Sequence, residues 1–285
     1  MLKTFVRDWL LPPGIDRLLA NSPSPVKKLW GTGNQFDLAG LTPLRATGKT
    51  AAGLEELLVA SYGEIVWIDT DKVRLWGRAL SWQQNHLVRY FKEGFPTYRK
   101  FFELHQPNNQ FEAIMLDPAQ VGAFSPVQPP IRRFPWSYEI MWRGEDGWDG
   151  SHGTQAHGPI SETKLLFERK RLDKVRASIE KHGFGILDDY DFIHFGELLV
   201  DDSNPGLVDY RVSLHGGIHR SSFLAHLGWP LIPMISAQGV ASREVRLSSL
   251  PHWPGVLDGT FSENAARAYF LAHFRDPSER LLPGW

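Results

Sequence analysis

The order of the elements between residues 158 and 236 constrains the fold of this chain more than any other feature. Apolar residues recur at helical spacing over 162–182, after Ser161 as an N-cap and before Gly183 as a stop. The apolar patterns that follow predict four more elements. These are the strands DFIHFGELLV and DYRVSL, a helix from about Arg220 to Leu227, and the strand PLIPMI. This order predicts one α/β unit, in which the Ser161 helix packs on a small mixed sheet.

Residues 1–150 carry a second set of predicted elements. Their patterns indicate a helix over 53–63, one or two strands over 64–76, two helices over 82–107 that Gly94-Phe95-Pro96 interrupts, and a short strand over 111–116. Aromatic residues are too frequent there for a free linker, so we expect this N-terminal α/β region to dock on the second part. The sequence therefore predicts an α+β (α/β) fold with two regions, 1–150 and 151–285.

Composition indicates the class of protein and the compartment. The chain has 285 residues, 42% of them hydrophobic, a formal net charge of -1 and no cysteine. Without cysteine there is no disulfide, thiolate nucleophile or cysteine-ligated metal, and the near-neutral charge argues against nucleic acid as a partner. No apolar run approaches the ~20 residues that cross a bilayer. We expect a cytoplasmic protein whose residues 1–20 form an amphipathic helix, packed on the protein's own body or lying peripherally on the inner membrane.

The glycine turn in LHGGIHRSSF is the first candidate site. A helix N-terminus offers unpaired N–H groups and partial positive charge, and glycines before it let an anion approach the backbone. Arg220 adds a planar fork suited to phosphate oxygens, and His219 adds a donor or an acid. The predicted phosphate site consists of residues of this turn: Gly216, Gly217, His219, Arg220 and Ser221. The alternative is a plain strand-to-helix turn with a surface arginine.

Longer stretches around the turn carry a family resemblance. The helix ERKRLDKVRASIEKHGF and the later stretch YRVSLHGGIHRSSFLAHLGWPLIPMI together resemble the ParB-like/sulfiredoxin-like superfamily, from Gly158 to Ile235. A basic amphipathic start followed by Pro12–Pro13, together with HGPIS and FFELHQP, is similar to uncharacterised ParB-like proteins associated with bacterial surface polysaccharide genes.

This resemblance implies a nucleotide, ATP or CTP, at the glycine turn. Sulfiredoxins hold ATP with G-G-C-H-R, ParB partition proteins hold CTP with a G-E-R-R-type turn, and free-serine kinases of this fold use a related turn. Carried over, Gly216, Gly217, His219 and Arg220 would contact phosphates. The sulfiredoxin cysteine falls on Ile218, which excludes that activity in a chain without cysteine. The proline-broken remainder of the chain does not fit the helix-turn-helix domain of partition proteins.

The basic helix after Ser161 supplies the candidates for chemistry. Phosphoryl transfer needs a carboxylate near the acceptor hydroxyl and basic groups that offset developing charge. Serine kinases of this fold use a glutamate, so the resemblance makes Glu168 the first choice for the carboxylate and Glu162 the second. Lys164 and Arg171 are the expected phosphate contacts of this helix, unless its charges only form a solvated face.

Three functions remain open from the sequence. The first is a kinase-like phosphotransferase that uses ATP or another nucleoside triphosphate on a hydroxyl of a small molecule, sugar or glycan, with His219 among the catalytic residues. The second is a nucleotide-binding regulatory or scaffold protein of polysaccharide biosynthesis without turnover, and the third is a ParB-like nuclease or DNA-binding protein. No dedicated metal site is predicted. Mg²⁺ would accompany the nucleotide, with two groups of aspartates as candidate oxygen ligands, at 188, 189 and 191 or at 69 and 71, unless they belong to solvated loops.

Overall fold

The computed structural model describes most of the chain between residues 50 and 275. Contacts between residues divide the chain into two units, 1–36 and 37–285, and every described residue belongs to the second unit. The described residues are 50–60, 65–75, 85–116, 133–137, 152–182, 184, 193–204, 206–236 and 243–275. The predicted helix over 1–20 and the aspartates at 188, 189 and 191 lie outside these ranges.

The fold is α+β, as predicted. Its α-helices are α4 (Leu54–Val59), α5 (His86–Glu93), α6 (Phe95–Leu104), α7 (Gln110–Ala113), α10 (Glu162–His182), α11 (Ile218–His226), α12 (Pro254–Leu257) and α13 (Glu263–Leu271). The strands are β1 (Ile65–Asp69), β2 (Val73–Leu75), β3 (His194–Asp201), β4 (Asp209–Gly216), β5 (Leu231–Ser236) and β6 (Arg243–Arg246). Short 3-10 helices, η1 (Thr70–Lys72) and η2 (Leu247–His252), follow β1 and β6. Within the described ranges no helix is both long and apolar enough to cross a membrane.

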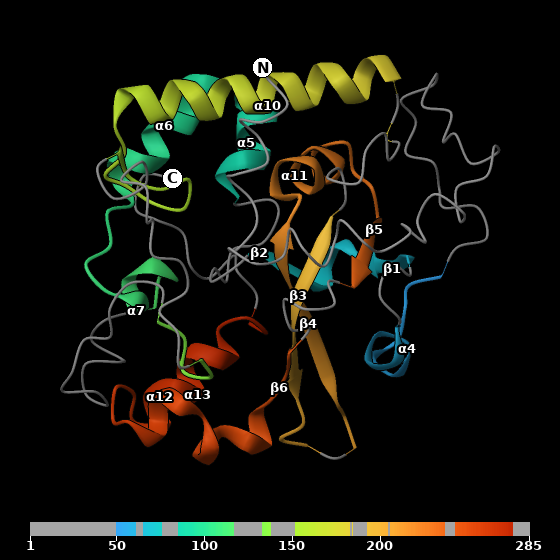
Figure 1. Ribbon diagram of the computed structural model, residues 1–285, viewed down its shortest axis with the longest axis vertical. Helices are drawn as coiled ribbons and strands as arrows, with labels where there is room; N and C mark the ends of the chain where they lie inside the picture. The colour runs from blue at the N-terminus through green and yellow to red at the C-terminus, as the bar shows by residue number, and fades with distance from the viewer. Residues whose placement is uncertain are drawn as a thin grey trace, which may run out of the picture. The chain divides into compact units, whose positions relative to one another are not determined.

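The described strands form one mixed sheet at the centre of the fold (Figure 1). Its strands run in the order β1-β5-β3-β4-β2, and β6 pairs with the later part of β3. The β1–β5 and β3–β4 pairs are antiparallel, whereas β2–β4, β3–β5 and β3–β6 are parallel. Since β1 and β2 come from before residue 150 and pair with β5 and β4, both predicted regions contribute to the same sheet.

One face of the sheet packs against helices and forms the first core. Alternate side chains of neighbouring strands point to this face, as the pleat requires: Val73, Val212 and Leu198 lie in one row, and Leu75 and Leu214 in another. All five are buried in a core that also contains residues of α5, α6, α10 and α11. This packing holds α11 over the strands directly after β4 ends.

The opposite face of the sheet forms a second core with the C-terminal helices. Leu199 of β3 and Val245 of β6 join Trp136 there, together with Tyr269 and Phe270 of α13. A polar row crosses the same face in register: Arg74, Ser213 and Glu197, on β2, β4 and β3, are all buried. The two faces of the sheet therefore differ in chemistry, one apolar and one mixed.

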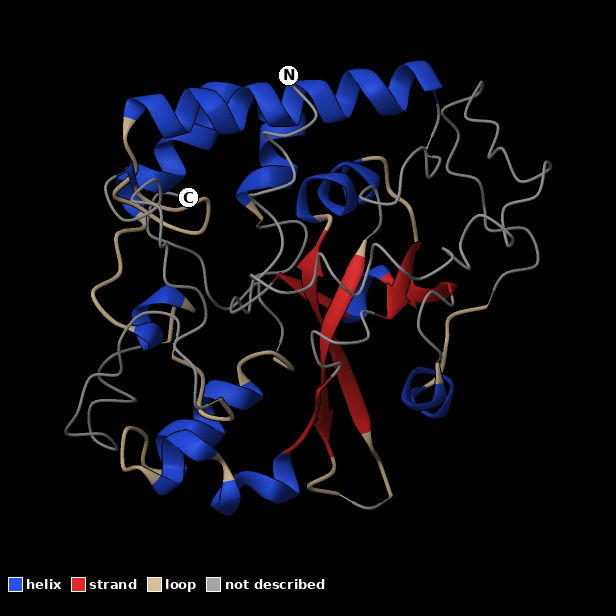
Figure 2. Cartoon of the chain, in the orientation of Figure 1, coloured by secondary structure: helices blue, strands red, loops and turns tan. Residues whose placement is uncertain are grey.

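Helix α10 lies on other helices rather than directly on the sheet. Its start matches the prediction, because Ser161 Oγ accepts a hydrogen bond from Lys164 N at 3.1 Å. Arg176 Nη2 donates to the Phe91 carbonyl of α5 at 2.9 Å, and α10 also contacts α11. Figure 2 shows α11 between α10 and the strands, which corrects the prediction that the Ser161 helix packs on the sheet itself.

The segment 111–116 is the element that the sequence assigned wrongly. The predicted strand is the short helix α7 followed by a turn at Ile114–Met115. Asn109 explains the difference, because its Oδ1 accepts hydrogen bonds from Phe111 N and Glu112 N and so starts a helix. The side chain of Phe111 then enters the second core.

Candidate functional site

The turn between β4 and α11 requires glycine by its backbone. Gly217 has φ 73° and ψ 21°, the left-handed region that residues with a Cβ rarely adopt, and it is the N-cap of α11. Among the described residues no side chain caps this helix N-terminus. The first N–H groups of α11 thus point out of a turn that carries no side chain of its own.

The serines of the first turn of α11 bind the backbone. Ser221 Oγ lies 3.1 Å from the Gly217 carbonyl and 3.0 Å from that of Ile218, and Ser222 Oγ lies 2.7 Å from the latter. Both serines are fully buried. Ser221, a predicted phosphate contact, therefore donates its hydroxyl proton within the turn and stiffens it.

Helix α10 brings a buried carboxylate and two cations to the turn. The side chain of Glu168 has no exposed surface. Lys164 Nζ lies 3.5 Å from Glu168 Oε1, and Arg171 Nη1 lies 3.3 Å from the same oxygen. The spacings i,i+4 and i,i+3 place these three side chains on one side of the helix.

His219 joins this cluster from α11. Its Nε2 lies 3.1 Å from Glu168 Oε2, so the carboxylate links α10 to the first turn of α11. Burial alone would raise the pKa of Glu168, but the hydrogen bond of His219 and the charges of Arg171, His219 and Lys164 lower it to about 2. Burial lowers the pKa of His219 more than the hydrogen bond with Glu168 raises it. At neutral pH the pair is an ionised carboxylate and a neutral imidazole whose Nε2–H donates to it.

The structure brings most of the predicted site residues together. Glu168 contacts His219 and also pairs with Lys164 and Arg171. Together with the residues that adjoin His219 in sequence, these four side chains form what we call the turn cluster: Lys164, Glu168, Arg171, Gly216, Gly217, His219, Arg220 and Ser221. Arg220 is half-buried in the first turn of α11.

Glu162, the second choice for the carboxylate, lies apart from the turn cluster. Its two oxygens each lie 2.6 Å from a guanidinium nitrogen of Arg99 on α6, and its side chain is 55% exposed. The structure therefore gives Glu162 a surface ion pair and leaves Glu168 as the carboxylate of the site.

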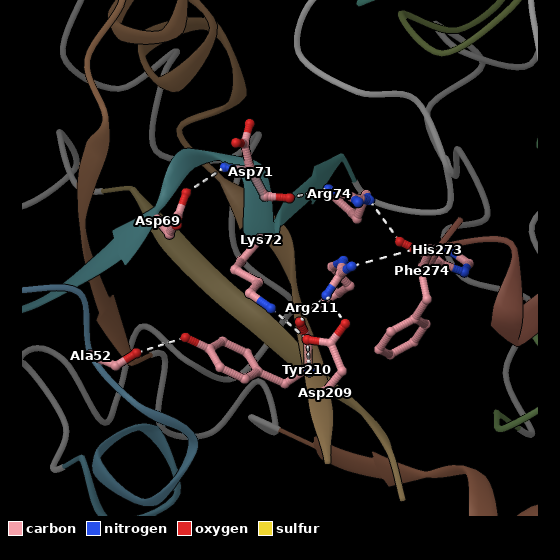
Figure 3. Close-up of polar contacts among 10 residues, drawn as sticks. All are labelled: Ala52, Asp69, Asp71, Lys72, Arg74, Asp209, Tyr210, Arg211, His273 and Phe274. Carbon is pink, nitrogen blue, oxygen red and sulfur yellow. Dashed lines mark hydrogen bonds and ion pairs between the residues drawn. The ribbon is translucent and has the colours of Figure 1, made fainter. Parts of the chain in front are cut away.

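Sequence reasoning missed a second polar cluster, at the end of α13 (Figure 3). Arg74 Nε donates to the His273 carbonyl at 2.8 Å, and Arg211 Nη2 donates to the Phe274 carbonyl at 3.4 Å. Burial and the charge of Arg211 lower the pKa of Arg74 to about 10. Cations at a helix C-terminus satisfy carbonyls that the helix leaves unpaired. Because these partners are backbone groups, 199 residues along the chain from Arg74, no sequence motif could reveal them.

The same view shows how β4 is fixed at its start. Lys72 and Arg211 both bind the carboxylate of Asp209, Arg211 at 2.7 Å. Tyr210 OH donates to the Ala52 carbonyl at 2.6 Å. These contacts tie β4 to the segment before α4, so we interpret the cluster as structural.

Of the candidate magnesium ligands, Asp69 and Asp71 belong to the described residues. Asp69 Oδ1 accepts a hydrogen bond from Asp71 N at 2.9 Å and caps η1 (Figure 3). Among the residues that the structure describes, no group of three or more histidine and acidic side chains forms a metal site.

No family model, curated protein or solved structure matches this chain.

Proposed function

We propose that this chain binds a nucleoside triphosphate by its phosphates over the Gly216–Gly217 turn and transfers a phosphoryl group from it to a hydroxyl. One observation carries the proposal: Lys164 and Arg171 of α10 converge, through Glu168, on the uncapped N-terminus of α11. The resemblance to the ParB-like/sulfiredoxin-like superfamily supports ATP or CTP as the nucleotide.

The charge of the turn cluster suits a polyphosphate. Lys164 and Arg171 contribute two positive charges, Glu168 contributes one negative charge, and His219 is neutral, so these four side chains carry a net charge of +1. Arg220 raises the total to +2. The partial positive charge of the helix N-terminus adds to this excess. Backbone N–H groups and a guanidinium fork are the donors that phosphate oxygens accept.

His219 is the proposed general base. Because its Nε2–H donates to the ionised Glu168, its Nδ1 keeps a lone pair that can accept a proton. In the proposed step the acceptor hydroxyl gives its proton to Nδ1 and its oxygen forms a bond to the terminal phosphorus. The bond between that phosphorus and the bridging oxygen breaks, which leaves a nucleoside diphosphate.

Glu168 then acts as a positioning residue. A carboxylate without exposed surface and with three cationic or hydrogen-bonding neighbours holds the imidazole in one tautomer, as the acidic member of a catalytic triad does. The same burial favours a second candidate function, nucleotide binding without turnover, because no acceptor can reach Glu168 directly. Phosphate release separates the two functions.

Replacing Arg220 tests the binding site. A charge-assisted contact contributes about 1.5–3 kcal/mol, so Arg220→Ala should weaken binding of ATP or CTP by roughly 10- to 100-fold. Arg220→Lys should recover only part of the affinity, because an ammonium group cannot reproduce the guanidinium fork. Calorimetric titration with each nucleotide and Mg²⁺ measures the change.

Arg267 provides the matched control for this titration. It is an exposed arginine on α13, away from the turn, so Arg267→Ala removes the same charge from another element. Equal affinity in the wild type and Arg220→Ala would show that the phosphates do not bind at the turn. An equal loss of affinity in Arg220→Ala and Arg267→Ala would show the same.

A further inference from the structure

The solvent-facing side of α10 carries a stripe of exposed residues. At about 100° of rotation per residue, one side of this helix collects six apolar or cationic residues, beside the small residues Thr163 and Ala177. All six are exposed, and we call them the outer stripe: Leu166, Phe167, Lys170, Arg171, Lys174 and Lys181. Four of these residues are cations and none is an acid.

The acidic residues of α10 lie outside the outer stripe, and the exposed ones border it on the side of Leu166. Glu168 is buried in the turn cluster, while Glu162 and Asp173 bind residues of α6 and α5. Glu180 falls on the same side as Glu162 and Asp173 by helical rotation. Acids of the same helix therefore do not interleave with the cations of the outer stripe.

Two large apolar side chains lie at one end of the outer stripe. Leu166 is 39% exposed and Phe167 is 42% exposed, and neither belongs to a core. The apolar packing of α10 uses other residues, because Leu165, Leu172 and Ile179 are buried in the first core. Exposed apolar side chains beside lysine and arginine are typical of helices that lie in a membrane interface.

We propose that the outer stripe docks this chain on an anionic lipid bilayer. The lysines would bind headgroup phosphates, while Leu166 and Phe167 would enter the boundary between headgroups and acyl chains. Nucleic acid fits less well, because the chain has a net charge of -1 and the stripe offers a single aromatic ring for base stacking. This surface shares Arg171 with the turn cluster, whereas Leu166, Phe167, Lys170, Lys174 and Lys181 lie outside that cluster.

Vesicle sedimentation of the full chain tests the surface. We expect binding to vesicles of equal parts phosphatidylglycerol and phosphatidylcholine, weakened by salt, and no binding to phosphatidylcholine alone. Each lysine near an anionic surface contributes about fivefold to binding. The double variant Lys170→Glu/Lys174→Glu should therefore bind roughly 30-fold or more weakly. Phe167→Ser should weaken it at every salt concentration, because that contribution is apolar.

The control variant has the same change in charge on helices other than α10. Lys100→Glu/Arg267→Glu reverses two exposed cations, on α6 and α13, and should keep the binding of the wild type. The proposal fails if the wild type does not bind anionic vesicles, or if the two double variants bind equally well. Tighter binding to single-stranded oligonucleotides that Lys170→Glu/Lys174→Glu abolishes would assign the stripe to nucleic acid instead.

Discussion

Glu168→Gln should lower the free energy of unfolding by about 3–5 kcal/mol, the usual result of removing one partner from a buried ion pair. The amide cannot balance Lys164, which is almost as buried as Glu168 itself. It also accepts more weakly from His219, which weakens the link between α10 and α11, and from Arg171 within α10. Urea denaturation of the wild type and the variant measures the loss.

Glu162→Gln is the matched control on the same helix. Glu162 pairs with Arg99 at the surface, where solvent screens the two charges and the pair contributes little to stability. A loss in Glu168→Gln no larger than that in Glu162→Gln would show that the buried cluster does not stabilise the fold.

The pH dependence of stability gives the same prediction an independent readout. The pKa of Glu168 is about 2 in the folded chain against an ordinary 4.5, which corresponds to about 3 kcal/mol. This stability is fully present above pH 4.5 and is lost as the pH falls towards 2. His219 also makes the fold less stable as the pH falls. Its pKa is lower in the folded chain, so acid protonates the unfolded chain more readily. Glu168→Gln should flatten the part of the profile below pH 4.5.

His219→Gln should slow phosphate release from ATP or CTP by at least about 100-fold while the nucleotide still binds. Glutamine can keep the hydrogen bond to Glu168 through its amide N–H, but it has no nitrogen that accepts a proton at neutral pH. Folding should survive for the same reason. Single-turnover phosphate release, with affinity measured alongside, separates the chemical step from binding.

Two outcomes would change the assignment of His219. Equal rates in the wild type and His219→Gln would exclude the imidazole as the base. A wild type that binds the nucleotide and releases no phosphate, with or without added hydroxyl acceptors, would favour the second function, nucleotide binding without turnover.

Local patterns predicted much of the fold and the site. The glycine stop at 94 separates α5 from α6, and the sequence from Ser161 onward predicted α10, β3, β4, α11 and β5 in order. These elements have strong local signals, namely caps, helical spacing and alternation. The pairing of Lys164, Glu168 and Arg171 also follows from helical spacing alone.

The sequence could not predict features that depend on distant contacts. The burial of Glu168 depends on how α10 crosses α11, which no local pattern states. The position of α10 on helices rather than on strands depends equally on tertiary packing. At 111–116 an apolar run resembled a strand, but the cap at Asn109 and the second core determine a helix there. The arginines at the end of α13 bind backbone carbonyls, which have no side-chain signature.

Thermal unfolding of the wild type with nucleotides and Mg²⁺ is the most direct test of a phosphate site at the Gly216–Gly217 turn. A ligand at 100 times its dissociation constant stabilises the folded state by about 2.7 kcal/mol, which raises Tm by several degrees. We expect ATP or CTP to raise Tm, and AMP and CMP, which lack the polyphosphate, to leave it nearly unchanged. A Tm that no nucleoside triphosphate raises, with ATP, CTP and GTP all present in large excess, would contradict the proposed site.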